Sequence, residues 1–510
     1  MNKRTFVKNT AVMTVTSLLL RTLGIVFRVF ISGRVGAEGM GLYQLVFSVY
    51  VLGTTFAAAG IVTAVTRMVA EQFARGTPSN VSRVMRLSMG LCALIGVLSA
   101  AVLYVGAPTI GDWIGDERTV PALAVSGLAL PFIGVASCIK GYFMARRRAM
   151  PPCVSQIVEQ AVRIGSILCM LHAAGECSLA EACRIIIVGD AISETVACVF
   201  LYIAHRLDRR SVAVKSKAHL PYRTLLRTLL NIAAPLTAGR YLSTALRTVE
   251  NILVPARLTL FTHADAVSLE QFGAVKGMAL PLIFFPSAFL MTVSGLLVPE
   301  LSDAYALGMK RQVKRLTEQA MHITWIGSVL IGCLFTVLGR RLGLLLYGDD
   351  TVGLFLQILG PLTPVMYLDS VASGMLKGIN EQVHSLWYSV ADSAVRITLI
   401  WLLLPRFGIT GFLFVMLVSN LLTCILSTRR LLTQSDTKMQ WLRWVVGPTL
   451  IAALVGGGWA ALGHVLSLRT DWLTVIGGMA FISLAYILLL PLFRCFTLND
   501  LKAFTRKKTT

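Results

Sequence analysis

The chain has 510 residues, of which 55% are hydrophobic and only 14% are charged, and its mean hydropathy is +0.73. A water-soluble protein would carry about 25% charged residues, so the composition excludes a soluble globular protein and indicates a membrane protein. The formal net charge of +22 would also suit a nucleic-acid-binding protein, and the positions of the basic residues decide between these two classes.

Apolar runs of about 20 residues recur along the whole chain, and each is long enough to cross a bilayer as a helix. The loops between them are too short to assemble a catalytic site, so the pattern favours a transporter over an enzyme. The predicted fold is an all-α polytopic membrane protein. In chain order we predict fourteen spans, at 9–32, 44–66, 87–108, 119–143, 153–174, 182–204, 228–256, 272–299, 318–338, 352–376, 385–404, 407–427, 445–466 and 473–493.

The basic residues follow the alternation of these spans. With the N-terminus inside, Lys and Arg are several times more frequent in the inner segments than in the outer loops. This is the positive-inside pattern of membrane proteins, and it explains the net charge without any nucleic-acid partner. It predicts a multi-pass protein of the cell membrane with both termini in the cytoplasm.

The first six spans are related in sequence to the next six. Shifting the chain by 233 residues aligns Pro131–Leu171 with Pro364–Leu404, with nine identical positions of 41 that include Ala-Val-Arg-Ile at 161–164 and 394–397. Because six spans return the chain to the same side, the two copies form parallel repeats, an architecture typical of transporters. We therefore predict a first six-helix lobe at 1–205, a basic linker at 206–227, a second lobe at 228–430, and two further helices with a basic tail at 431–510.

Charged residues inside the predicted spans are the candidate functional residues, because charge at bilayer depth is costly. Glu159 and Arg163 in span 5, and Asp392 and Arg396 in span 11, are acid–arginine pairs spaced four residues apart, so each pair can bond within its own helix. Such a pair either only neutralises its own charge or faces a polar cleft between the lobes. The further acids of spans 6 and 7 that we assign to charge pairs or ion coupling are Asp190, Glu194 and Glu250.

Arg21 and Arg28 in span 1 are seven residues apart and share one helix face. Their span contains no acid, so they pair either with Asp190, Glu194 or Glu250 on other spans or with an anionic ligand. A guanidinium group can hold a phosphate by two hydrogen bonds, which makes these arginines candidate substrate ligands. The other cations that we assign to substrate binding are Arg240, Arg247 and Lys276.

Three stretches resemble a known family. "RTLGIVFRVFISGRVGAEGMGLYQLVFSVYVL" at 21–52, "VTAVTRMVAEQFARG" at 62–76 and "GMALPLIFFPSAF" at 277–289 are similar to the stage V sporulation protein B family. This family belongs to the polysaccharide-flippase branch of a superfamily that also contains lipid II flippases and multidrug and toxin extruders. The resemblance covers essentially the whole chain.

The resemblance implies a fold of fourteen helices in two lobes and alternating-access transport of an anionic lipid-linked saccharide, such as an undecaprenyl-diphosphate-linked cell-wall, spore-cortex or polysaccharide precursor. In the related lipid II flippases, arginines of the first helix face the diphosphate, and Arg21 and Arg28 match that pattern. This chain has Thr54 and Thr55 near the place of a second-helix arginine, and Lys276 corresponds only approximately to an eighth-helix cation. These departures count against lipid II itself as the substrate, but not against an anionic lipid-linked sugar in general.

Two other functions stay open at this point, namely a cation-coupled multidrug extruder of the same superfamily and a non-transporting scaffold in envelope or spore assembly. We expect no cofactor and no metal site, because no metal-type spacing is present among the ten cysteines. The coupling source, whether Na⁺, H⁺ or the membrane potential, is left open. The expected partners are the lipid-linked saccharide and membrane lipids, with the protein as a monomer.

Overall fold

The computed structural model describes residues 3–58, 60–75, 77–210, 220–437, 439–465, 471–493 and 495, and these contain helices and no strands. The chain divides into two compact units, Met1–Gly273 and Ala274–Thr510. Residues 211–219 of the predicted linker, and all of the basic tail after Phe493 except Cys495, lie outside the described residues.

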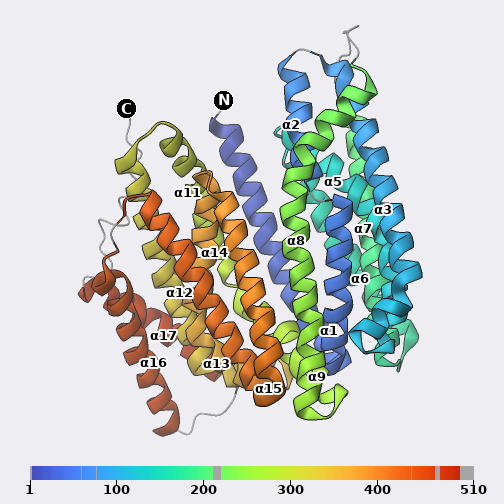
Figure 1. The fold of residues 1–510 in the computed structure, drawn as a ribbon. Helices are drawn as coiled ribbons and strands as arrows, with labels where there is room; N and C mark the ends of the chain where they lie inside the picture. The colour runs from blue at the N-terminus through green and yellow to red at the C-terminus, as the bar shows by residue number, and fades with distance from the viewer. Residues whose placement is uncertain are drawn as a thin grey trace. The chain divides into compact units, whose positions relative to one another are not determined.

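Unit 1 consists of nine described α-helices with two short 3₁₀ segments, η1 (Glu117–Thr119) and η2 (Gly127–Ala129), on either side of α4 (Figure 1). A buried apolar cluster joins α2, α3, α5, α7 and α8. The α-helices are α1 (Lys3–Ala58), α2 (Ile61–Ala74), α3 (Pro78–Ile114), α4 (Val120–Ser126), α5 (Leu130–Ala145), α6 (Met150–Ala174), α7 (Leu179–Arg210), α8 (Tyr222–Thr262) and α9 (Asp265–Phe272).

Unit 2 begins at the second residue of a π-helical segment, η3 (Gly273–Ala279), which follows α9 in the chain. The buried cluster of unit 2 joins α11, α12, α14 and α15. Its other described elements are α10 (Leu280–Phe284), α11 (Ser287–Ala306), α12 (Lys310–Tyr347), α13 (Asp350–Leu359), the 3₁₀ segment η4 (Gly360–Leu362), α14 (Thr363–Gly378), α15 (Gln382–Gln434), the π-helical η5 (Leu442–Val446), α16 (Gly447–Val465) and α17 (Trp472–Leu492).

Every predicted span falls on helical segments, so the predicted all-α membrane fold is confirmed. Ten helical segments of the described chain are long and apolar enough to cross a membrane. Two of them, Val12–Ala74 and Gln382–Gln434, hold two predicted spans each. The spans predicted at 228–256 and 272–299 are α8 and α9–α11; they are not among the ten, since α8 carries three charged residues within its span and the second is interrupted by a turn after Phe284.

Glycines mark where the long helices turn back. Gly36 in α1 has φ 68° and ψ −176°, and Gly408 in α15 has φ 56° and ψ −139°. Positive φ is costly for residues with a Cβ and open to glycine. These two glycines therefore divide each long helix into two spans.

The internal duplication extends to backbone conformation. Gly175, which ends α6, has φ 63° and ψ −126°, close to the values of Gly408 at the 233-residue offset. Gly115 after α3 (φ 80°, ψ 17°) corresponds in the same way to Gly348 after α12 (φ 67°, ψ 16°). Two turns of the first six-helix bundle thus recur in the second at the same offset, which supports the two pseudo-symmetric lobes.

The helix caps are repeated too. The carboxylate of Asp116 accepts a hydrogen bond from the backbone N–H of Arg118 at 3.0 Å, and that of Asp349 accepts one from the N–H of Thr351 at 2.7 Å. An aspartate at this position satisfies an N–H that the first helical turn leaves unpaired. The short helices that follow the caps, η1–α4 and α13, therefore start at equivalent positions.

The two compact units are defined by which helices pack together, whereas the two predicted lobes are defined by the sequence duplication. α8, the first helix of the predicted second lobe, contacts α1, α2, α3 and α9, all within unit 1. The lobe boundaries at 205 and 228 stay a prediction from the sequence repeat.

Candidate functional site

Arg163 is the centre of an ion network in unit 1. Its Nη2 atom lies 2.9 Å from Oε1 of Glu159, one turn earlier on α6, as the spacing predicts. Its Nε atom lies 2.7 Å from Oδ1 of Asp190 on α7, and its Nη1 donates a hydrogen bond to Oε1 of Gln160 at 3.2 Å. The pair is therefore more than a self-neutralising feature of α6, because a second acid on another helix shares the arginine.

Further charges surround this network. Glu194, half-buried on α7, lies within electrostatic range of Glu159 and of Lys140 on α5. The charge of Arg28 on α1 acts on the Asp190 carboxylate. Three acids of unit 1 are thus opposed by three cations, which are Arg163, Lys140 and Arg28. Balanced charge lowers the cost of placing so many ionised groups at depth.

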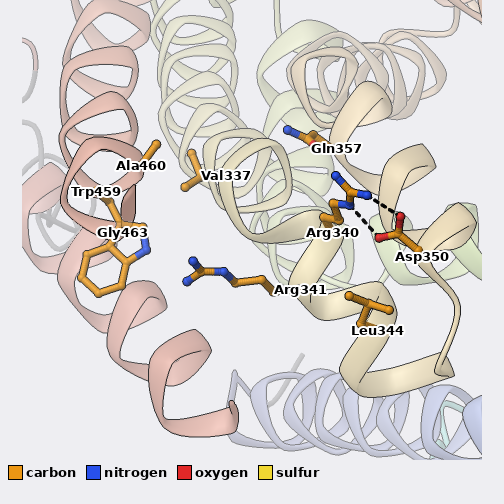
Figure 2. A pocket seen from close by; sticks show the side chains of 9 residues that line it. All are labelled: Val337, Arg340, Arg341, Leu344, Asp350, Gln357, Trp459, Ala460 and Gly463. Carbon is orange, nitrogen blue, oxygen red and sulfur yellow. Dashed lines mark hydrogen bonds and ion pairs between the residues drawn. The ribbon is translucent and has the colours of Figure 1, made fainter. Parts of the chain in front are cut away.

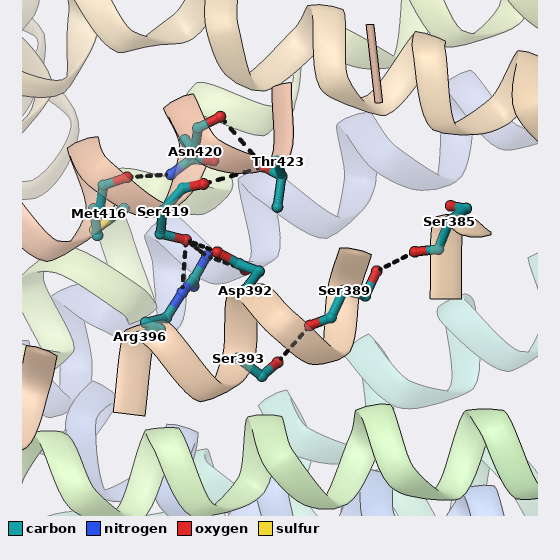
Figure 3. Close-up of polar contacts among 9 residues, drawn as sticks. All are labelled: Ser385, Ser389, Asp392, Ser393, Arg396, Met416, Ser419, Asn420 and Thr423. Carbon is teal, nitrogen blue, oxygen red and sulfur yellow. Dashed lines mark hydrogen bonds and ion pairs between the residues drawn. The ribbon is translucent and has the colours of Figure 1, made fainter. Parts of the chain in front are cut away.

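Unit 2 contains the corresponding network on the two halves of α15 (Figure 3). Nη2 of Arg396 lies 3.2 Å from Oδ2 of Asp392. Ser419, beyond the turn at Gly408, accepts hydrogen bonds from Nε and Nη2 of Arg396 at 3.0 and 2.5 Å and donates one to Oδ1 of Asp392. A serine hydroxyl therefore takes the bridging place that the Asp190 carboxylate has in unit 1.

A further acid, Asp369 on α14, interacts electrostatically with Asp392, and the hydroxyls of Thr423 and Ser427 lie beside it. Its Oδ1 atom is buried without a hydrogen-bond partner in the described part of the chain. Asp369 thus stands beside a second acid, Asp392, and the ion pair that the described contacts show here is the one between Asp392 and Arg396. No group of three or more His, Cys, Asp and Glu among the described residues is arranged to hold a metal ion.

The five predicted substrate cations occupy different environments. Arg21 on α1, and Arg240 and Arg247 on α8, are exposed in unit 1 and form no ion pair with an acid among the residues described. Arg28 is half-buried. Lys276 lies in the π-helical segment of unit 2, where its Nζ is 5.7 Å from the centroid of the Phe412 ring.

Of the acids predicted as partners for the span 1 arginines, Asp190 pairs with Arg163 at ion-pair distance and reaches Arg28 only electrostatically. Glu250 is buried on α8, with 3% of its surface exposed. Among the described contacts, Arg21 forms no ion pair with an acid, and its predicted role as a substrate ligand stays a prediction.

Polar contacts connect α8 to the second half of α1. Thr248 donates to the carbonyl oxygen of Ser48 at 3.1 Å, and Nδ2 of Asn251 donates to Oγ of Ser48 at 2.9 Å. Further along, the Thr55 and Thr244 hydroxyls are 3.5 Å apart. These polar contacts are accompanied by an aromatic one, in which the rings of Phe56 on α1 and Tyr241 on α8 have centroids 4.4 Å apart.

Lys140, Ser419 and Asp369 belong to these networks but were not among the predicted site residues. Asp369 and Lys140 are charged residues within spans, and that signal could have found them. Ser419 gives no signal, because a lone serine in an apolar helix usually bonds to its own backbone.

The fold is shared with solved transporters. A lipid II flippase MurJ in an inward closed conformation matches with a TM-score of 0.71 at 12% identity, covering 94% of this chain and 98% of that one. An inward-facing multidrug resistance MATE family transporter matches with a TM-score of 0.65 at 14% identity, covering 83% and 96%. The molecule therefore has the fold of the MATE-like and lipid II flippase membrane transporters.

The family follows from sequence. The chain belongs to the polysaccharide biosynthesis protein family, whose model matches residues 6–304. A curated relative, stage V sporulation protein B of Bacillus subtilis (strain 168), is 24% identical over 435 residues, which are 84% of this chain and 83% of that protein. The predicted family resemblance is thus confirmed.

Proposed function

We propose that the protein is an alternating-access flippase that moves an anionic lipid-linked saccharide across the cytoplasmic membrane. The observation that carries this proposal is the contrast between two sets of arginines. Arg163 and Arg396 are matched with acids in their own units, whereas Arg21, Arg240 and Arg247 are exposed on α1 and α8 without an acidic partner in the described residues. Unmatched cations within apolar helices suit a ligand that brings its own negative charge.

The ligand chemistry follows from these side chains. An undecaprenyl-diphosphate carrier presents phosphate oxygens, which guanidinium groups bind by paired, charge-assisted hydrogen bonds. Arg21 and Arg28 stand about 10.5 Å apart along α1 at 1.5 Å per residue. In the proposed cycle one arginine holds the diphosphate while the other holds a neighbouring sugar or takes over the phosphate as the access side changes.

We propose that the contacts between α1 and α8 break and re-form during each transport cycle. Alternating access requires helices of the two predicted lobes to separate on one side of the membrane. Hydroxyl contacts such as Thr55 to Thr244 exchange with water at low cost, because each hydrogen bond adds only about 1 kcal/mol net. We infer that this polar line parts when the access side opens.

Coupling is assigned to the acid-rich cluster of unit 2. Asp369 lies beside Asp392, which is already paired with Arg396, so two neighbouring acids could share one proton or one monovalent cation, and the Thr423 and Ser427 hydroxyls offer oxygen ligands. MATE family relatives in fold are multidrug transporters, and the same acids favour the second candidate function, a cation-coupled extruder. Transport measured under an imposed Na⁺ gradient, H⁺ gradient or membrane potential would identify which of the three drives it.

The proposal also includes the orientation of the chain in the membrane, the class of its substrate and its oligomeric state. We propose that both termini lie in the cytoplasm, which the positive-inside pattern supports, and that flipping proceeds without a catalytic step. The relatives include a sporulation protein and a lipid II flippase, so the saccharide is proposed to be a cell-wall, spore-cortex or polysaccharide precursor. We propose that a single chain, as a monomer, provides the whole pathway.

The direct test is reconstitution of the full chain in liposomes that carry a fluorescent undecaprenyl-diphosphate saccharide. We expect the protein to bring the labelled lipid of the inner leaflet to the outer leaflet, where an external quencher or lectin can reach it. In a depleted strain the same precursor should accumulate on the inner leaflet. Transport of organic cations without any movement of the lipid-linked sugar would support the multidrug extruder. A folded protein that transports neither compound would support the non-transporting scaffold.

A further inference from the structure

The turn between α2 and α3 contains two buried side-chain amides, those of Gln72 and Asn80. Nδ2 of Asn80 donates a hydrogen bond to Oε1 of Gln72 at 3.1 Å, and Oγ1 of Thr77 donates to the same oxygen at 2.9 Å. Burying an amide is costly unless its donors and acceptors find partners. The pair therefore calls for a role beyond filling space.

The amide pair holds the peptide that leads into α8. Oδ1 of Asn80 accepts a hydrogen bond from the backbone N–H of Leu220 at 3.2 Å, and Nη1 of Arg83 donates one to the carbonyl oxygen of Leu220 at 3.0 Å. The guanidinium carbon of Arg83 also lies 5.5 Å from the centroid of the Tyr222 ring. Side chains of α3 thus bind both backbone groups of a residue that is 137 to 140 positions away in the chain.

Apolar packing extends this contact along the first turns of α8. Leu225 and Leu229 are buried in the cluster that also contains residues of α2, α3, α5 and α7. A Cβ placed on Gly60, which precedes α2, would lie 2.9 Å from the carbonyl oxygen of Ala233, so the backbone of α8 passes close to this glycine. The beginning of α8 is therefore embedded in unit 1 as far as Ala233.

The turn between α2 and α3 occurs again in unit 2, between α11 and α12, at an offset of 232 residues. Arg75 ends α2 with φ −78° and ψ 0°, and Leu307 ends α11 with φ −85° and ψ 0°. The backbone N–H groups of Thr77 and Met309 each bond to the carbonyl oxygen five residues earlier, at 3.0 and 2.9 Å. The two turns therefore share one backbone conformation.

The second turn lacks the two amides. Ala304 and Gln312 stand where the first turn has Gln72 and Asn80, and Gln312 is exposed. Since the backbone of the turn is the same with and without the amides, the turn itself does not require them. Their role lies in what the first turn binds.

The chain segment that follows each copy explains this difference. The first copy is followed by α8, which contacts α3. The second copy is followed by α16, which contacts α12, the counterpart of α3. Figure 2 shows side chains of both helices, such as Val337 and Trp459, around a cavity of about 660 Å³. The amide pair is thus present at the turn that receives the start of α8 and is replaced at the turn that does not.

We propose that the contact of Asn80 and Arg83 with Leu220 is a dock that holds the first turns of α8 on unit 1 throughout the transport cycle. The part of this inference that concerns the cycle rests on the proposed flippase function. Thr244 lies about 33 Å along α8 from Tyr222 at 1.5 Å per residue. A small rotation of α8 about its docked end therefore separates Thr244 from α1 while the dock stays closed.

The first test is hydrogen exchange of the full chain in nanodiscs, followed by mass spectrometry. The Leu220 amide should be protected, and Asn80→Ala should speed its exchange by about tenfold, the effect of losing one buried hydrogen bond. Arg83→Ala should act in the same direction. Arg86→Ala, exposed one turn further along α3, is the matched control and should leave the exchange unchanged. Unchanged exchange at Leu220 in folded Asn80→Ala and Arg83→Ala would overturn the dock.

The second test is a covalent tether across the dock. A short bismaleimide between Arg83→Cys and Tyr222→Cys should leave the rate of saccharide flipping unchanged, and the single-cysteine variants treated with the same reagent are the controls. Asn80→Ala without the tether should flip several-fold more slowly, because α8 loses its fixed end, and the tether should restore the rate.

The outcomes separate this inference from the flippase proposal. A tethered chain that stops flipping would overturn the dock, since the contact would then have to open in each cycle. Unchanged flipping by Asn80→Ala with faster exchange at Leu220 would also overturn its role in transport. An unmodified chain that flips no saccharide would refute the flippase and the part of the inference that concerns the cycle, whereas the exchange rates would still show whether Asn80 and Arg83 hold Leu220.

Discussion

Arg163 on α6 lies 2.7 Å from Asp190 on α7 and joins two helices of unit 1 through one ion pair. The Asp190 side chain is only 8% exposed, so removal of the arginine leaves a buried carboxylate without its main partner. Breaking such a pair is far more costly than never having formed it. The contact therefore predicts a structural effect that is separate from any effect on transport.

Arg163→Leu should lower the stability of the protein by roughly 3 kcal/mol, the scale for breaking a buried ion pair. Thermal unfolding of the detergent-solubilised chain would measure this loss. Adding Asp190→Asn to the same variant should restore part of it, because the uncompensated charge is then gone. Arg184→Ala, an exposed arginine of α7, is the control, and equal melting temperatures for both arginine variants would contradict the network.

Arg21→Ala and Arg28→Ala should each abolish lipid-linked saccharide transport while the protein still folds and inserts. The reason is loss of a guanidinium that binds the diphosphate, and Lys at either position should restore only part of the rate because the planar, two-point geometry is missing. Arg34→Ala, exposed on the same helix, should transport normally. Full complementation by a stable Arg21→Ala, Arg28→Ala double variant would refute the assignment.

Asp369→Asn should uncouple transport from its driving ion. The substitution removes the negative charge that Asp369 places beside Asp392 and keeps the size of the side chain, so the two positions no longer attract a proton or a cation. Flipping in liposomes should then be the same with and without an imposed Na⁺ or H⁺ gradient. A gradient dependence equal to that of the unmodified chain would show that coupling occurs elsewhere.

The sequence predicted the helices and the duplication well, because both rest on local signals. Runs of apolar residues and a 233-residue repeat with aligned Gly and Pro needed no knowledge of packing, and Gly175 and Gly408 do share their backbone conformation. The spacing of Glu159 and Arg163 likewise predicted their contact, since one helical turn separates them.

The contacts between helices could not be predicted from the sequence. Nothing local distinguishes Asp190 as a partner of Arg163 from Asp190 as a partner of Arg21, because the choice depends on how α1, α6 and α7 pack. The bridge by Ser419 arises only once the two halves of α15 lie side by side. The packing of α8 into unit 1 is similarly a tertiary result, and the repeat could not reveal it.

The last prediction concerns the line of contact between α1 and α8. The Thr55 and Thr244 hydroxyl oxygens are 3.5 Å apart, so cysteines at both positions are close enough for a disulfide after small side-chain rotations. If these helices separate during each cycle, oxidation of the Thr55→Cys, Thr244→Cys variant should stop flipping, and a reductant should restore it. Mass spectrometry of the linked peptides would verify the bond.

Single-cysteine variants and the unmodified chain, which contains ten cysteines of its own, serve as oxidation controls and should keep their activity. A reductant-sensitive block confined to the double variant would show that α1 and α8 must part for transport. Continued flipping at the unmodified rate by fully cross-linked protein would mean that this contact is permanent, and the opening movement would then have to be sought among other helices.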